Sequence, residues 1–235
     1  MTAVSALLFD VFGTVVNWRE GVSRDVATIA EKHNVAINAD AFADSWRAQY
    51  QPGMEEVRTG RRAFTILDVL HRENLKKVAL DNGLPELAAQ DEDFLVTAWH
   101  RLPGWPDSSE GLLRLKKKFI IATQSNGNIA LIVNLAKYAQ LPWDVVLGAE
   151  VVGHYKPQPE AYEKACSALG LATENCMMVA AHNDDLVAAR ATGMKTAFVC
   201  RPTEHGAAQT TDLHAKEKWD VIADDFLDLA DKLCK

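Results

Sequence analysis

The chain has 235 residues, of which 48% are hydrophobic and 24% are charged, and its formal net charge is −7. This composition is typical of a globular protein with enough apolar side chains for one large domain, or for a core with a smaller unit beside it. The negative charge and the lack of a basic block argue against a nucleic-acid partner.

No apolar stretch approaches the roughly 18 residues that a membrane span needs, and residues 1–5 lack the cationic start of a signal peptide. The cysteines are scattered without the paired spacing of a zinc site or a disulfide framework. They are Cys166, Cys176, Cys200 and Cys234. The sequence therefore predicts a cytoplasmic protein with reduced thiols and no membrane contact.

The first predicted element is a buried parallel strand over residues 6–9, and Asp10 follows it directly. Its residues are apolar or small on both faces, as in a strand covered by helices on both sides. Gly13 then allows the backbone to turn sharply. Ligands of open α/β sheets lie at the carboxyl ends of strands, which makes Asp10 a candidate site residue. Taken alone, however, this stretch favours an ordinary role for Asp10, as a helix cap or a loop carboxylate.

Residues 17–101 predict helices only, because apolar side chains recur at spacings of three and four. One helix is expected to stop near Pro52-Gly53 and another at Asn82-Gly83. No part of this span predicts a strand. We therefore interpret it as one all-helical insert.

From residue 102 onward, predicted strands alternate with predicted helices. The strands are expected at 119–123, 144–148, 177–181, 195–200 and 221–223, and the last helix at 226–233. This alternation predicts a doubly wound, Rossmann-like parallel sheet with helices on both faces. The predicted α/β core comprises residues 1–16 and 102–235, with residues 17–101 inserted between them.

Polar residues follow or lie near the ends of four of these strands. They are Asp10, Thr14, Ser125, Asn126, Lys156, His182 and Asp185. The carboxyl ends of parallel strands meet at one edge of a sheet, so we expect these side chains to lie close together. Each of them alone has an ordinary explanation as a helix cap or a solvated charge. Their joint order and spacing make the pattern specific.

These motifs resemble those of the haloacid dehalogenase superfamily over essentially the whole chain. The matching stretches are Asp10 to Thr14, Ser125-Asn126-Gly127, Lys156-Pro157 with Tyr162, and Asp185 to Met194. The helical insert is similar to the cap domain of that superfamily. Because Trp46-Arg47 also matches, the chain resembles the type II branch, the L-2-haloacid dehalogenases.

Two departures bear on the chemistry. Phosphatases of the superfamily have a second Asp where this chain has Phe12, and a Gly-Asp pair where it has Ala180-Ala181. A hard divalent cation would thereby lose two usual oxygen ligands, so no metal and no other cofactor is expected. Better-known type II members have a Ser-Ser-Asn run where this chain has Ala180-Ala181-His182, which leaves the activation of water open.

The resemblance implies hydrolysis of short 2-haloalkanoic acids to 2-hydroxy acids with inversion. Asp10 would attack the halogen-bearing carbon and form an ester, which water then hydrolyses. Lys156 would keep Asp10 ionised, Thr14 would steady the carboxylate, and Arg47 would stabilise the departing halide.

The remaining candidate residues bind the substrate or activate water. Ser125 and Asn126 are suited to hold the substrate carboxylate near a helix N-terminus, and the pocket walls would be Phe12, Trp46 and Trp105. Asp185 would anchor the hydrolytic water or Lys156. His182 is either a general base for that water or a neutral histidine that is satisfied by neighbouring loops.

Two alternatives remain open at this point. One is a magnesium-dependent phosphatase acting on a small phosphate ester, and the other is a binding module that kept only the fold. Phe12 and Ala181 argue against the first, and the joint presence of Asp10 and Lys156 argues against the second. The expected partners are a 2-haloacid and halide, and a homodimer through the cap helices is plausible from the resemblance alone.

Overall fold

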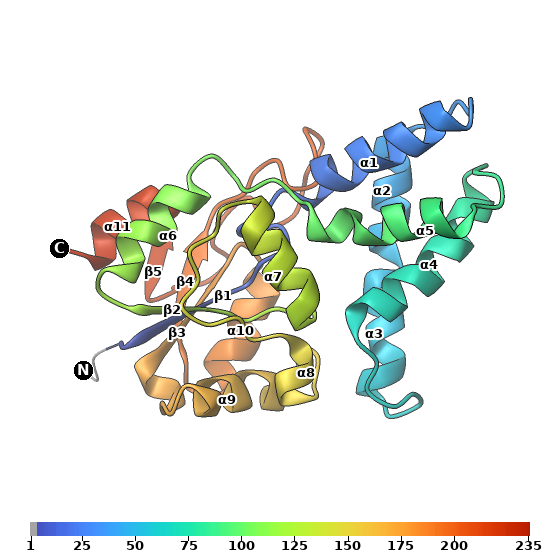
Figure 1. The fold of residues 1–235 in the computed structure, drawn as a ribbon. Coiled ribbons are helices and arrows are strands. Elements are labelled where there is room, and N and C mark those ends of the chain that lie inside the picture. The colour runs from blue at the N-terminus through green and yellow to red at the C-terminus, as the bar shows by residue number, and fades with distance from the viewer. Residues whose placement is uncertain (1–3) are drawn as a thin grey trace.

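A computed structural model describes residues 4–235 of the chain. Its sheet has five parallel strands in the order β2-β1-β3-β4-β5 (Figure 1). The strands are β1 (Ala6–Phe9), β2 (Ile120–Thr123), β3 (Cys176–Ala180), β4 (Lys195–Val199) and β5 (Val221–Ala223). The chain leaves β1 on one side to form β2 and crosses to the other side to form β3. The carboxyl end of β1 is therefore the switch point at which ligands bind in such sheets.

Helices cover both faces of the sheet, which explains why its strands are apolar on both sides. Leu7 and Phe9 of β1 pack toward α6 (Ser108–Lys116), α7 (Ile129–Tyr138) and α11 (Phe226–Leu233). Leu8 points to the opposite face, against α9 (Pro159–Ala168) and α10 (Asn183–Ala191). Figure 1 shows these two helical layers, with the short α8 (Ala149–Val152) beside α9. The predicted α/β class is confirmed.

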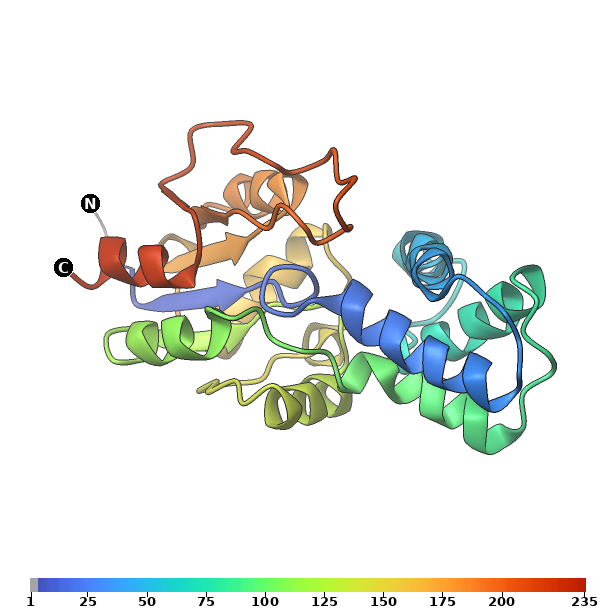
Figure 2. The ribbon, with the colours of Figure 1, turned by 90° about the horizontal axis from the view of Figure 1, so that it is seen from above.

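Residues 17–101, between β1 and α6, form a group of helices beyond the carboxyl end of β1 (Figures 1 and 2). The helices are α1 (Trp18–Lys32), α2 (Ala39–Ala48), α3 (Tyr50–Arg58), α4 (Leu67–Asp81), α5 (Ala89–Val96) and the 3-10 turn η1 (Thr97–His100). The structure has no strand within residues 17–101, as the sequence predicts. Across residues 4–235, none of the helices is long and apolar enough to cross a bilayer.

The helix boundaries in this segment correct one prediction. Helix α3 runs through Pro52-Gly53, where a stop was expected. Pro52 lies in the first turn of the helix, where its missing N–H has no intrahelical partner to lose. The stop at Asn82-Gly83 is confirmed, since α4 ends at Asp81 and Gly83 has a φ of 77°.

The strand predicted at 144–148 is also corrected, because the structure has only a single bridge between Val145 and Ala122 there. Side chains replace the regular ladder at both ends of this stretch. The Thr123 hydroxyl accepts from the Leu147 N–H at 2.8 Å and donates to the Leu147 carbonyl at 3.0 Å. The Asp144 carboxylate accepts from the Ile121 N–H at 3.0 Å. The segment therefore follows β2 without pairing as a strand.

Candidate active site

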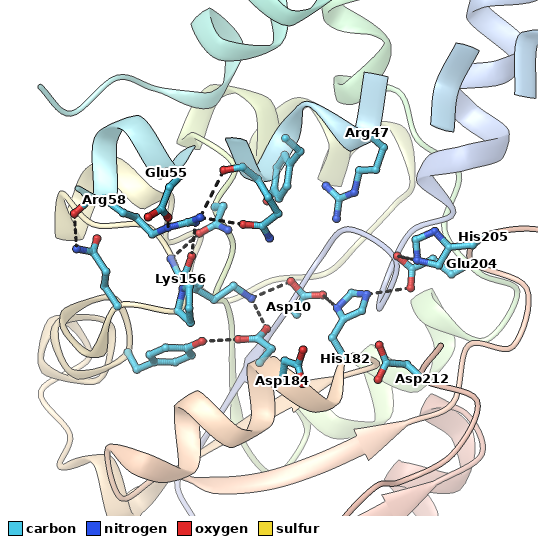
Figure 3. Close-up of a pocket in the computed structure, with 17 residues that line it drawn as sticks. Asp10, Arg47, Glu55, Arg58, Lys156, His182, Asp184, Glu204, His205 and Asp212 are labelled. Atoms are coloured by element: carbon cyan, nitrogen blue, oxygen red, sulfur yellow. Dashed lines mark hydrogen bonds and ion pairs between the residues drawn. The ribbon is translucent and has the colours of Figure 1, made fainter. Parts of the chain in front are cut away.

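The ends of β1 and β3 and the helix α3 border a cavity of about 710 Å³ (Figure 3). Six of the predicted site residues line it. They are Asp10, Arg47, Asn126, Lys156, His182 and Asp185. Residues far apart in the sequence thus meet at the edge of the sheet where the strand order predicts a site.

Asp10 extends β1 by one residue, since its N–H donates to the Val179 carbonyl at 3.0 Å. Its Oδ1 accepts from Lys156 Nζ at 2.9 Å. Its Oδ2 accepts from the Thr14 hydroxyl at 2.7 Å and lies 3.1 Å from His182 Nδ1. The Ala181 N–H donates to the same Thr14 hydroxyl at 2.9 Å, so the hydroxyl hydrogen is directed at Asp10. Both carboxylate oxygens are therefore held in place.

The charges around Asp10 keep the carboxyl ionised. Burial opposes ionisation, but Lys156 and His182 outweigh it and hold the pKa of Asp10 well below its usual range. Burial also disfavours the ammonium of Lys156, yet Asp10 and Asp185 raise the pKa of Lys156 above its usual value. Asp185 forms a very short contact with Lys156 Nζ and accepts from the Tyr162 hydroxyl at 2.6 Å. At neutral pH the three charged groups form one buried network.

His182 lies between two carboxylates (Figure 3). Its Nε2 is 2.9 Å from Glu204 Oε2, while Nδ1 faces Asp10. Burial lowers the pKa of His182, but the charges of Glu204 and Asp10 outweigh burial and raise this pKa well above its usual value. His182 is therefore an imidazolium at neutral pH in the free protein.

Glu204 is a cavity residue in contact with His182 that the sequence analysis missed. It belongs to the long loop between β4 and β5 (Figure 2), where a single Glu has no sequence signal. Its Oε1 accepts from Trp18 Nε1 at 2.9 Å, and the residue is only 1% exposed. Arg201 anchors this loop, because its guanidinium forms two 2.8 Å hydrogen bonds with the Asp107 carboxylate and donates from Nε to the Thr14 carbonyl at 2.9 Å.

Gly13 leaves room for Glu204, and we expect Gly13→Ala to be more destabilising than an ordinary glycine substitution. A Cβ on Gly13 would lie 2.0 Å from Glu204 Oε1, so the buried carboxylate would have to move. Gly13 also has a φ of 86°, which costs other residues about 1–2 kcal/mol. Urea denaturation measures the loss of unfolding free energy.

Gly83→Ala is the matched control, because Gly83 has a φ of 77° and an added Cβ would meet no described residue within 4 Å apart from its chain neighbours. The Gly83→Ala variant should lose only the unfolding free energy that a side chain costs at a positive φ. An equal loss of unfolding free energy in both variants would show that Gly13 does not make room for Glu204.

Arg47 lines the cavity without an acidic partner among the described residues. Its Nη1 is buried and makes no hydrogen bond. The guanidinium carbon lies 4.0 Å from the ring centroid of Tyr50 and 5.9 Å from that of Phe12. By contrast, the cavity cation Arg58 pairs with Glu55 at 2.8 Å. Arg47 thus offers unused N–H donors to an anion that enters the cavity.

The structure places the predicted aromatic walls elsewhere. Trp46 is buried within the helical group, where its Nε1 donates to the His71 carbonyl at 3.1 Å. Successive helical residues point about 100° apart, so Trp46 faces away when Arg47 faces the cavity. Trp105 Nε1 donates to the Gly13 carbonyl at 2.8 Å. Neither tryptophan lines the cavity, and the buried Phe12 shapes it only from behind Arg47.

Of the two residues predicted to hold the substrate carboxylate, Ser125 and Asn126, only one lines the cavity. Asn126 lines the cavity, and its Oδ1 accepts from the Lys156 N–H at 2.8 Å. Ser125 does not line the cavity, because its hydroxyl accepts from the Gly127 N–H at 3.0 Å in a local turn. At the start of α7, the Ile129 N–H already donates to Glu150 Oε1 at 2.8 Å. An internal carboxylate thus occupies part of the anion site expected there.

The residues around Asp10 do not fit the magnesium ion that the phosphatase alternative would require. Both Asp10 oxygens face cationic side chains, Lys156 and His182, which a divalent cation would have to displace. Phe12 and Ala181 supply no side-chain oxygen. Among residues 4–235, no three His, Cys, Asp or Glu side chains are arranged to hold a metal jointly.

Comparisons with known proteins agree with this geometry. A family model described as haloacid dehalogenase-like hydrolase matches residues 4–193. The chain is 28% identical to (S)-2-haloacid dehalogenase 4A of Burkholderia cepacia over 202 residues, which are 85% of this chain and 84% of that protein. It is 26% identical to (S)-2-haloacid dehalogenase 1 of Pseudomonas sp. (strain CBS-3) over 214 residues, 88% of this chain and 91% of that one.

Solved structures are more similar still. A defluorinating L-2-haloacid dehalogenase is 47% identical, with a TM-score of 0.97, and the match covers 99% of this chain and 96% of that one. A second L-2-haloacid dehalogenase is 43% identical with a TM-score of 0.95, covering 99% of both chains.

Proposed function

The chain belongs to the haloacid dehalogenase-like hydrolase family, and on that premise we propose that it hydrolyses short 2-haloalkanoic acids to 2-hydroxy acids with inversion. Its similarity to L-2-haloacid dehalogenases makes it a hydrolase of carbon–halide bonds. The observation that supports the reaction best is that an ionised carboxylate and an unpaired cation border one cavity. Among the described residues, Asp10 Oδ1 accepts a single hydrogen bond, and the buried Arg47 Nη1 makes none.

In the first step, Oδ1 of Asp10 forms a bond to the halogen-bearing carbon, and the halide leaves with the bonding electron pair. Oδ1 is the attacking atom because Oδ2 is already held by Thr14 and His182. Lys156 keeps the carboxylate ionised and aimed. Arg47 is the cation that receives the departing halide, and Asn126 lies where it can contact the substrate carboxylate.

In the second step, water attacks Cγ of the Asp10 ester and the bond from Cγ to Oδ1 breaks. Asp185 accepts one proton from the water, and Lys156 donates a proton to the departing Oδ1, which becomes the product hydroxyl. Asp185 then returns its proton to Lys156 through their direct contact. Asp10, left as a carboxylic acid, releases one proton to solvent, which balances the HX formed.

A single turnover in water enriched in heavy oxygen tests this sequence of steps. We expect the protein to gain one heavy oxygen, located on Asp10 by peptide mass spectrometry, while the released hydroxy acid carries none. Heavy oxygen in the hydroxy acid and none in Asp10 would mean that water attacks the substrate directly, which is incompatible with an ester intermediate.

The substrate range can be measured by halide release from chloro-, bromo- and fluoroacetate and from both enantiomers of 2-chloropropionate. Fluoroacetate is informative because one similar enzyme is a defluorinating one. The division into a core (1–16 and 102–235) and a cap (17–101), the cytoplasmic location and the homodimer stay predictions. The cationic side chains on both oxygens of Asp10 argue against the magnesium-dependent phosphatase.

A further inference from the structure

We propose that Glu204 is a positioning residue that keeps His182 protonated throughout the reaction, so that His182 Nδ1 and the Thr14 hydroxyl form the oxyanion hole for hydrolysis of the Asp10 ester. This inference rests on the proposed function and deepens its second step. It assigns His182 the role of a charged hydrogen-bond donor, in place of a general base for water.

The two oxygens of Asp10 are not equivalent. Among the residues that the structure describes, Oδ1 accepts a hydrogen bond from Lys156 alone, at 2.9 Å. Oδ2 accepts from the Thr14 hydroxyl at 2.7 Å and faces His182 Nδ1 at 3.1 Å. When Oδ1 carries the substrate carbon, Oδ2 becomes the ester carbonyl oxygen with both donors already in place. Attack by water moves the carbonyl electron pair onto Oδ2, and that pair returns when the bond from Cγ to Oδ1 breaks. Donors fixed at such an oxygen stabilise the developing charge.

The second carboxylate in contact with His182, that of Glu204, is held in place by buried neighbours. Glu204 Oε2 lies 2.9 Å from His182 Nε2, and Oε1 is held by Trp18 Nε1 at 2.9 Å. Glu204 is almost fully buried, and only a glycine at position 13 leaves space for it. A carboxylate in this position orients the ring so that Nδ1 points at Asp10.

Esterification removes the charge of Asp10 but leaves that of Glu204. In the free protein His182 faces Asp10 on one side and Glu204 on the other. Glu204 itself also faces His205 at 3.7 Å and lies within electrostatic range of Arg47. Once Asp10 is an ester, Glu204 is the one carboxylate still in direct contact with His182 among the described residues. A base must be neutral to accept a proton, and a buried ion pair with Glu204 disfavours the neutral form.

Asp10→Asn provides a direct readout, since its uncharged amide imitates the esterified side chain. The probe is nitrogen NMR of histidine-labelled protein, followed as a function of pH, with the His182 signals assigned by comparison with His182→Gln. In Asp10→Asn we expect His182 to titrate above the ordinary value of about 6.5. In the double variant with Glu204→Gln we expect titration at or below that value. Titration of Asp10→Asn itself at or below the ordinary value would overturn the proposal.

Glu204→Gln tests the same idea in the reaction. Removing the charge leaves His182 free to titrate, and only its protonated form is the better donor. The rate of ester hydrolysis in single turnovers should fall by about 10- to 100-fold at high pH, less than the loss of a whole oxyanion-hole donor. The rate of ester hydrolysis in Glu204→Gln should decrease as the pH rises past the pKa of His182. If His182 were a base, the rate would increase over the same range, so the sign of the slope decides between the roles.

Glu56→Gln is the matched control, because it removes a carboxylate that pairs with Arg61 on the exposed surface. It should hydrolyse the ester at the wild-type rate at every pH. A pH slope in Glu204→Gln that matches Glu56→Gln and the wild type would also overturn the proposal.

Halide release, which reports the first chemical step, distinguishes a failure of this inference from a failure of the proposed function. If the wild-type protein releases no halide from any 2-haloacid, the proposed function fails. If halide is released and the ester forms, but the slope of Glu204→Gln rises with pH, only the assignment of Glu204 and His182 fails.

Discussion

Asp10→Asn is expected to abolish halide release, with a fall in kcat of at least about 10⁴-fold, as for the loss of a covalent nucleophile. The amide has no negative charge with which to displace a halide. None of the side chains that contact Asp10 can replace it, because Lys156 and His182 are cations and Thr14 is a weak nucleophile. Halide release from 2-chloropropionate measures the effect.

The control for this variant is Asp231→Asn, which changes an exposed carboxylate near Arg114 in the same way. It should keep full activity. Thermal unfolding of Asp10→Asn must remain cooperative, so that lost activity reports chemistry and not misfolding. Multiple turnovers by a folded Asp10→Asn protein at more than a hundredth of the wild-type rate would refute the assignment of Asp10 as the nucleophile.

Lys156→Met is expected to lower both activity and stability. It leaves Asp10 and Asp185 facing each other without the buried ammonium that lies between them. Removal of one partner from a buried ion pair costs about 3–5 kcal/mol of unfolding free energy. The variant should also lose kcat by on the order of 10²–10³-fold, because a fixed donor at the reacting carboxylate is gone. Urea denaturation and halide release measure the two effects.

The pH dependence of this stability loss has a definite sign. The pKa of Asp10 is depressed in the folded protein, so its stabilising contribution is complete above the unfolded value of about 3.9 and disappears as the pH falls through the folded value. The pKa of Lys156 is raised, so its contribution is complete below about 10.4 and disappears as the pH rises through the folded value. The difference between wild type and Lys156→Met should therefore be constant from about pH 5 to 10 and shrink at both lower and higher pH.

The exposed Lys76→Met variant controls for the loss of a lysine as such, because Lys76 only approaches Glu92 at 3.6 Å on the surface. It should change the unfolding free energy by less than about 1 kcal/mol. A stability loss in Lys156→Met no larger than this would show that the buried network does not hold Asp10 in its charged form.

Local sequence patterns determined the α/β class and most of the elements. An apolar run of four or five residues, bounded by polar turns, is sufficient to predict a strand buried on both faces, as in β1 and β3. The same reasoning fails at 144–148, where the apolar run is Val145 to Leu147. There the side chains of Thr123 and Asp144 take the hydrogen bonds that a neighbouring strand would need. A side chain from another segment decides that outcome.

The sequence by itself also determined which groups meet at the edge of the sheet. Asp10 and Asp185 follow the parallel strands β1 and β3, and Lys156 follows the stretch at 144–148 that lies beside β2. Asp10, Lys156 and Asp185 were predicted to meet in this way, and they do. Only the tertiary structure decided that Arg47, and not Trp46, faces the cavity, since helical periodicity separates two faces without saying which one is turned to the site. It also brought Glu204 to His182 from a loop with no periodic pattern of its own, because a contact between distant segments leaves no trace in the local sequence.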